Sequence, residues 1–88
     1  MKYRATEHAL VKPLDEGAMA LNLESGDYYS LNETAARMWA LMERGCSQAE
    51  IVAIVAADYQ VSTEQVESDL AGLLRELLDR KLIVEEQS

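Results

Sequence analysis

The chain has 88 residues, enough for one packed domain, and 49% of them are apolar. Eight Lys and Arg stand against sixteen Asp and Glu, and the formal net charge of −8 disfavours binding to a phosphate backbone or an anionic membrane surface. A single cysteine excludes an intramolecular disulfide, and no apolar run is long enough for a signal sequence or a membrane span, so we expect one cytoplasmic domain over residues 1–88.

The first third of the chain carries the patterns of three short strands. An apolar run at residues 8–12 ends at Pro13. Residues 18–23 then alternate between two faces with a period of two, as a half-buried strand does. A third run at 28–31 contains two tyrosines, which favour strands. Turn signals rich in Gly, Asp and Glu separate the three runs, and the pattern predicts a three-stranded antiparallel sheet.

Two helices are predicted after the strands. Asn32 is a suitable N-cap for the first, whose apolar face ends before Gly45 and comprises Ala35, Met38, Trp39 and Met42. Ser47 and Glu50 form a capping box at the start of the second. Its predicted apolar face comprises Ile51, Ile54, Val55 and Tyr59.

A third helix begins at a further capping box, Ser62 with Gln65, and runs to about Arg80. The tail at 82–84 is apolar and is suited to one more short strand. Strands followed by helices indicate an α+β fold. We therefore expect a three-stranded antiparallel sheet followed by three helices, in a winged-helix-like arrangement.

The third helix has a wide apolar face. At roughly 100° per residue, its apolar arc from Leu73 to Ala71 spans about 160°, more than a surface helix requires. One interpretation is that the core buries both flanks of this arc. The other is that one flank, carrying Leu74, Leu78 and Ala71, lines a groove for an extended or helical peptide. Periodicity alone leaves both open.

The strand at 28–31 is the last of the predicted sheet and is a candidate edge. An exposed edge presents unpaired N–H and C=O groups to another strand, and neither Lys nor Pro blocks this one. Tyr29 and Leu31 share one face, and Tyr28 and Ser30 share the other. The alternatives are an ordinary half-buried strand, an edge that accepts a peptide, and an edge that pairs two copies of the chain in a dimer.

Catalytic chemistry is not indicated. His8 and Cys46 make one pair of metal ligands, short of a four-ligand site, and Cys46 has no second cysteine for a redox motif. There is no glycine-rich phosphate loop and no nucleophile elbow around Ser47. We expect no enzyme activity, no metal and no cofactor.

Two other binding functions fit poorly. A helix-turn-helix DNA reader would use the third helix, but that helix carries mostly acidic residues against Arg75 and Arg80, so we expect no nucleic-acid partner. An acyl carrier would need Asp-Ser-Leu at a helix start, whereas residues 68–70 read Ser-Asp-Leu inside a helix. A winged-helix nucleic-acid-binding or dimerisation module remains the alternative from another class.

Two segments resemble PqqD-like proteins. The first is residues 23–36, Leu-Glu-Ser-Gly-Asp-Tyr-Tyr-Ser-Leu-Asn-Glu-Thr-Ala-Ala. The second is residues 66–70, Val-Glu-Ser-Asp-Leu, with the paired leucines that follow and the closing Lys-Leu-Ile at 81–83. The resemblance covers roughly residues 7 to 85. The order and spacing of the strand, the Leu-Asn cap and the final helix carry it together.

The resemblance implies a recognition element for the leader segment of a ribosomally synthesised precursor peptide. Such domains have three strands followed by three helices, and the leader adds as a strand beside the third strand, against the third helix. They present the precursor to a separate tailoring enzyme. By this resemblance the peptide-binding residues are Tyr28, Tyr29, Ser30, Leu31, Val66, Asp69, Leu70, Leu73, Leu74 and Leu77.

The paired tyrosines separate this chain from one branch of the family. Relatives in pyrroloquinoline quinone synthesis usually have a plainer strand, so a role as a peptide chaperone of that pathway is the alternative. The tyrosine-rich strand is closer to relatives that serve lasso-peptide or radical-SAM pathways. The implied partners are therefore a leader peptide and either a radical-SAM enzyme or a leader peptidase.

Overall fold

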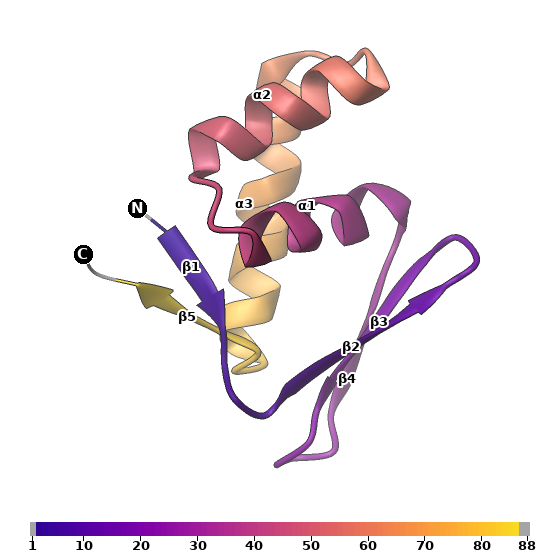
Figure 1. Ribbon diagram of the computed structural model, residues 1–88, viewed down its shortest axis with the longest axis vertical. Helices are drawn as coiled ribbons and strands as arrows, with labels where there is room; N and C mark the ends of the chain where they lie inside the picture. Colours follow the sequence, from indigo (N-terminus) through magenta and orange to yellow (C-terminus); the bar gives the residue numbers. More distant parts are fainter. Residues whose placement is uncertain (1, 87–88) are drawn as a thin grey trace.

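The computed structural model describes residues 2–86, which form strands at both ends of the chain and helices between them (Figure 1). The strands are β1 (Lys2–Ala5), β2 (Ala9–Leu14), β3 (Gly17–Asn22), β4 (Tyr28–Leu31) and β5 (Ile83–Glu86), and the helices are α1 (Glu33–Glu43), α2 (Gln48–Tyr59) and α3 (Thr63–Asp79). The predicted α+β order of strands and then three helices is confirmed.

The predicted three-stranded sheet is present, with antiparallel strands in the order β2-β3-β4. Gly17 opens β3 with a φ of 125°, and a Cβ there would lie 2.1 Å from the carbonyl oxygen of Leu31, so this position requires glycine. On β3 the small residues Ala18 and Ala20 face the core, while Met19 and Leu21 lie on the opposite face. The alternation at 18–23 is thus confirmed.

The first strand of the predicted sheet, which is β2 in the structure, extends past Pro13, where we expected it to end. Pro13 is the fifth residue of β2 and pairs with Ala18. The bond from the Leu23 amide to the His8 carbonyl, at 2.8 Å, places the even-numbered residues of β2 in the hydrogen-bonded pairs. The Pro13 nitrogen therefore faces the open edge of the sheet, where a missing N–H costs no ladder bond.

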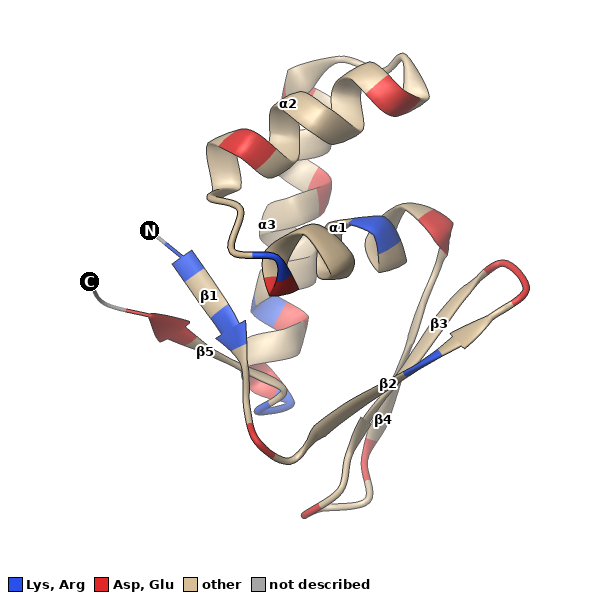
Figure 2. Ribbon diagram, in the orientation of Figure 1, with Lys and Arg blue, Asp and Glu red and all other residues tan. Residues whose placement is uncertain are grey.

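A second, two-stranded sheet joins the two ends of the described chain. The predicted apolar tail forms β5, and its antiparallel partner is β1, a strand that the sequence pattern did not predict. The two strands carry opposite charges, with Lys2 directly opposite Glu86 (Figure 2). Because the pairing spans most of the chain, no local signal could reveal it.

The helices begin where their caps predict. Asn32 Oδ1 accepts the amide of Ala35 at 2.8 Å, and Ser47 forms the full capping box with Glu50. Ser62 accepts the Gln65 amide, but the Gln65 side chain donates to Asp69 at 2.9 Å and does not close a box.

The predicted apolar face of α2 is partly wrong. The core buries four of its residues, Ile51, Val52, Val55 and Ala56, whereas Ile54 and Tyr59 are only half-buried. The buried stripe is rotated because α2 packs against both α1 and α3. A nearly continuous apolar sequence at 51–57 does not specify which side is covered.

One apolar core joins the three helices to both sheets. α1 lies between the sheets, contacting β1 on one side and β3 and β4 on the other, while α2 and α3 pack on each other beside it (Figure 1). The largest fully buried side chains include Leu31, Met38, Leu77 and Leu82. None of the helices within residues 2–86 has the length and apolarity to cross a membrane.

Candidate functional site

Strand β4 forms an open edge of the three-stranded sheet. It pairs with β3 alone, and the Asn22 amide donates to the Asp27 carbonyl at 2.8 Å at the start of their ladder. Antiparallel pairs alternate, so the backbone groups of Tyr29 and Leu31 point to β3, and those of Tyr28 and Ser30 point outward. In the part of the chain that the structure describes, no hydrogen bond reaches the outward N–H or C=O of Ser30.

The side chains of β4 divide as the alternation predicts. Leu31 is buried and Tyr29 is half-buried on the face toward the helices. Tyr28 and Ser30 lie on the opposite face, where 60% of Tyr28 is exposed. Of the two tyrosines, only Tyr29 can therefore contact a molecule held between β4 and the helices.

An open groove lies on the helix side of this edge, and we refer to it as the β4–α3 groove. β4 supplies one wall, the first turns of α1 supply the floor, and α3 supplies the other wall. The lining residues are Tyr29, Asn32, Thr34, Ala35, Met38, Ser68, Asp69, Gly72, Leu73 and Glu76. An extended chain in this groove would lie beside the unpaired backbone of Ser30.

The residues expected on α3 divide between the groove and the core. Asp69 and Leu73 line the groove, so the structure brings them together with Tyr29. The other four, Val66, Leu70, Leu74 and Leu77, are between 1% and 6% exposed and pack in the core, and Leu73, at 7%, packs in the same core although it also borders the groove. These four form the inner face of α3 and support its wall of the groove, but they do not line it.

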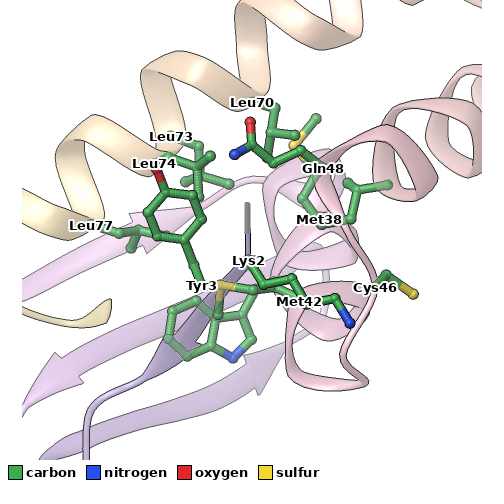
Figure 3. Close-up of a pocket in the computed structure, with 12 residues that line it drawn as sticks. Lys2, Tyr3, Met38, Met42, Cys46, Gln48, Leu70, Leu73, Leu74 and Leu77 are labelled. Carbon is green, nitrogen blue, oxygen red and sulfur yellow. The ribbon is translucent and has the colours of Figure 1, made fainter. Parts of the chain in front are cut away.

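The opposite flank of α3 is covered by the chain itself. Tyr3 of β1 lies against Leu74, with Leu70 and Leu77 close by (Figure 3). The packing leaves a void of about 10 Å³, no more than one water molecule requires. Ala71 and Leu78, expected with Leu74 on a possible groove flank, are exposed and line a shallow surface hollow together with Leu74 and Tyr3.

Arg80, which follows the last residue of α3, connects the helix to β4. Its Nη1 donates to the Tyr28 carbonyl at 3.2 Å and pairs with Asp27 at 3.1 Å, while its Nε pairs with Glu76 at 3.3 Å. Its guanidinium carbon lies 4.8 Å from the centre of the Tyr29 ring, within the range of a cation–π contact. The side chain thus stands at one end of the groove.

Hydrogen bonds to the backbone of Arg80 and of the two residues after it hold Arg80 in this position. The buried Asn22 donates from Nδ2 to the Arg80 carbonyl at 3.0 Å. Lys81 takes a left-handed φ of 59°, and the amides of Lys81 and Leu82 return to the carbonyls of Leu78 and Leu77. This Schellman motif fixes the last turn of α3.

The groove is acidic on its α3 side. Asp69 and Glu76 both line it, and both have polar partners, Gln65 for Asp69 and Arg80 for Glu76. Figure 2 shows acidic residues on all three helices, while the strands β2 to β4 carry little charge. The electrostatics favour a neutral or basic occupant over an acidic one.

Sequence reasoning did not include Gly72 and Arg80 among the site residues. Asp69, Gly72, Leu73, Glu76 and Arg80 follow one another at intervals of three or four, apart from the adjacent pair at 72–73, and so share one helix face. This spacing is a usable signal, but the positions that the resemblance implies on α3, apart from Asp69 and Leu73, lie on its buried face. Gly72 exposes open space where a Cβ would stand, which widens the groove at mid-helix.

Within residues 2–86, no group of three or more His, Cys, Asp or Glu is placed to hold a metal ion. Cys46 is a free, half-buried thiol packed against the core. His8 contacts the Lys81 carbonyl through Nε2 at 3.0 Å, which ties the turn before β2 to the end of α3. The two side chains that we considered as metal ligands thus have separate structural surroundings.

Comparisons with known proteins agree on one group. A family model described as Coenzyme PQQ synthesis protein D (PqqD) matches residues 17–83. The structure titled "TbiB1 in Complex with the TbiA(beta) Leader Peptide" is 31% identical, with full coverage of both chains and a TM-score of 0.85. "Lasso peptide synthetase B1 complexed with the leader peptide" is 27% identical, covers 97% of this chain and 100% of its own, and has a TM-score of 0.86. No match was found among curated proteins.

Proposed function

We propose that this chain, which belongs to the PqqD family, binds the leader segment of a ribosomally synthesised precursor peptide in the β4–α3 groove. The observation that carries the proposal is the unpaired outward backbone of Ser30 beside a groove between an edge strand and a helix. This is the geometry of strand addition, in which a peptide extends a sheet and places alternate side chains in pockets. Both similar structures are complexes with leader peptides, and one of them is titled as a lasso peptide synthetase.

The backbone of β4 and the side chains of the groove contribute differently to peptide binding. Backbone hydrogen bonds to the edge depend little on the peptide sequence, so they give affinity with little selection. Selection comes from the side chains that line the groove, chiefly the Tyr29 ring and Leu73, with Asp69 favouring a basic neighbour. The buried residues Val66, Leu70, Leu74 and Leu77 act indirectly, because they keep the α3 wall in place.

The protein acts by holding a peptide and has no catalytic role in this proposal. A tailoring enzyme performs the chemistry on the part of the precursor that extends beyond the groove. A lasso-type or radical-SAM-type pathway is favoured over pyrroloquinoline quinone synthesis, supported by the likeness to a lasso peptide synthetase and by the paired tyrosines of β4. The single cysteine is consistent with the proposed cytoplasmic setting.

Calorimetric titration with synthetic leader peptides tests the function. The probes are the TbiA(β) leader peptide and the leader segment of the precursor encoded near this chain. We expect one site with a Kd of about 1 μM or tighter, about −8 kcal/mol. Leu73 borders the groove but is also part of the core, so Leu73→Ala should weaken binding about tenfold in a variant that circular dichroism shows to be folded. Arg75→Ala, on an exposed position of the same helix, should not weaken binding. Failure of both leaders to bind would contradict the proposal.

The same open edge can also pair two copies of the chain. Such a dimer would occupy Ser30 and compete with the leader for β4. Sedimentation at several protein concentrations, with and without leader, separates the two uses of the edge. We expect a monomer when the leader is bound, and a dimer that persists at saturating leader would assign the edge to self-association.

A further inference from the structure

The open edge of β4 offers unequal positions to an added strand. Two of its residues, Tyr28 and Ser30, point their backbone groups outward. Those of Ser30 have no partner among residues 2–86, but both groups of Tyr28 are occupied by the chain itself. The Tyr28 carbonyl accepts Arg80 Nη1 at 3.2 Å, and the Tyr28 amide donates to Asp27 Oδ1 at 3.0 Å.

Arg80, the donor to the Tyr28 carbonyl, is held in position by several further contacts. Arg80 has charged partners on both sides of the groove end, Asp27 before β4 and Glu76 on α3. Its guanidinium also covers the ring of Tyr29. Asn22 binds the Arg80 carbonyl, so the backbone below this side chain is fixed as well.

The position of this guanidinium conflicts with a longer peptide strand. An added strand would place a backbone amide opposite each outward carbonyl of β4. Arg80 Nη1 already donates to the Tyr28 carbonyl, the group to which that amide would bond. To bond there, the peptide would have to displace a charge-assisted hydrogen bond together with an ion pair.

We propose that Arg80 is a specificity-determining residue that ends the peptide ladder at Ser30, so that the bound strand pairs with Ser30 and extends toward α1, but makes no backbone bond with Tyr28. This inference rests on the proposed function, because it concerns how the same edge receives a leader. The end of the ladder at Ser30 sets the register of the peptide, because a peptide shifted by two residues along β4 would place its side chains in different parts of the groove.

A scan of the peptide backbone tests the register. Each amide of the TbiA(β) leader and of the leader encoded near this chain is N-methylated in turn, which removes one donor at a time. Affinities for the parent and for Arg80→Ala are then measured. For every position, the ratio between methylated and unmethylated peptide is compared in the two proteins. The comparison cancels any general loss of affinity in the variant.

The expected profiles differ at one amide. In both proteins, methylation of the amide opposite the Ser30 carbonyl should weaken binding about tenfold, as the loss of one backbone hydrogen bond requires. Methylation of the peptide amide two residues away, opposite the Tyr28 carbonyl, should change the affinity of the peptide for the parent protein less than twofold. For Arg80→Ala it should weaken binding several-fold, because the carbonyl becomes available. Identical profiles in parent and variant would overturn the register proposal.

Two controls separate charge from geometry. Arg75→Ala removes one positive charge from an exposed position of the same helix and should retain the profile of the parent. Arg80→Lys retains the charge but not the planar guanidinium, so its profile should lie between those of the parent and Arg80→Ala. If neither leader binds any of these proteins, the proposed function fails and this inference fails with it. If leaders bind with the same profile throughout, only the inference fails.

Discussion

The two flanks of α3 differ both in composition and in their surroundings. One flank, with Leu70 and Leu74, lies under Tyr3 and belongs to the core. The other, with Asp69, Gly72 and Leu73, borders the β4–α3 groove. What separates them is β1, a strand from the far end of the chain that covers one flank and leaves the other open. The cover from β1 and the composition of each flank together decide which face of α3 is left open as a binding surface.

The largest effect is expected on the covered flank. Leu74 is 6% exposed, and Leu74→Ala should lower the free energy of unfolding by about 2–5 kcal/mol, because it leaves a cavity below Tyr3. Leu78→Ala is the matched control, since Leu78 is 39% exposed one turn later and should cost less than about 1 kcal/mol. Urea denaturation measures both. Equal losses would place the boundary of the core elsewhere on α3.

Tyr29→Ala should affect stability and binding together. It removes a half-buried ring that contacts Arg80, at a cost of about 1–3 kcal/mol in unfolding free energy, and it should weaken leader binding at least tenfold. Tyr28→Ala is the control on the other face of the strand. Its side chain is 60% exposed, and the variant should lose less than about 0.5 kcal/mol and retain its affinity. If calorimetry shows a larger loss of leader affinity for Tyr28→Ala than for Tyr29→Ala, the peptide binds on the face of β4 that carries Tyr28.

Gly72→Ala should separate stability from function. Ala is favoured over Gly inside a helix by about 0.8–1.0 kcal/mol, and a Cβ at this position meets nothing within 4 Å. The variant should therefore unfold at a higher urea concentration than the parent. It also adds a methyl group to the wall of the groove, so leader affinity should fall several-fold. A stabilised variant that binds as tightly as the parent would show that the peptide does not approach α3 here.

The smallest effect is expected at the start of α2, away from both flanks. Hydrogen bonds from the backbone and side chain of Ser47 lower the pKa of Glu50 below its ordinary value of 4.5. The lowered pKa means that the carboxylate stabilises the fold above about pH 4.5, and that this contribution is lost as the pH falls through the pKa of the folded state. Glu50→Gln should thus be less stable than the parent at pH 7, and the difference should shrink as the pH is lowered below about 4.5. A difference that does not change with pH would contradict this assignment.

The parts of the fold that the sequence predicted are local. Asn32, Ser47 and Ser62 cap helices through contacts three residues away, and the turn at Gly26 joins neighbouring strands, so short patterns suffice to find them. The edge position of β4 and the division of its faces also followed from strand order and alternation.

The remaining features depend on contacts distant in the sequence. β1 pairs with β5 across nearly the whole chain, and this pairing brings Tyr3 over one flank of α3. Arg80 reaches Asp27 and Tyr28 more than fifty positions earlier, a contact that no local pattern encodes. The apolar run predicts a strand that ends at Pro13, whereas β2 continues through it, because the Pro13 nitrogen points away from β3 and no ladder bond is lost.

Amide hydrogen exchange of the protein with and without bound leader tests the central claim most directly. If the peptide adds to β4 in the groove, exchange at the Ser30 amide should slow markedly, and chemical shifts should change along Ser68, Asp69, Gly72 and Leu73. The amides of β1 and of Ala71 and Leu78 should remain as in the free protein. Protection that gathers on β1 and the covered flank, with Ser30 unchanged, would contradict the account.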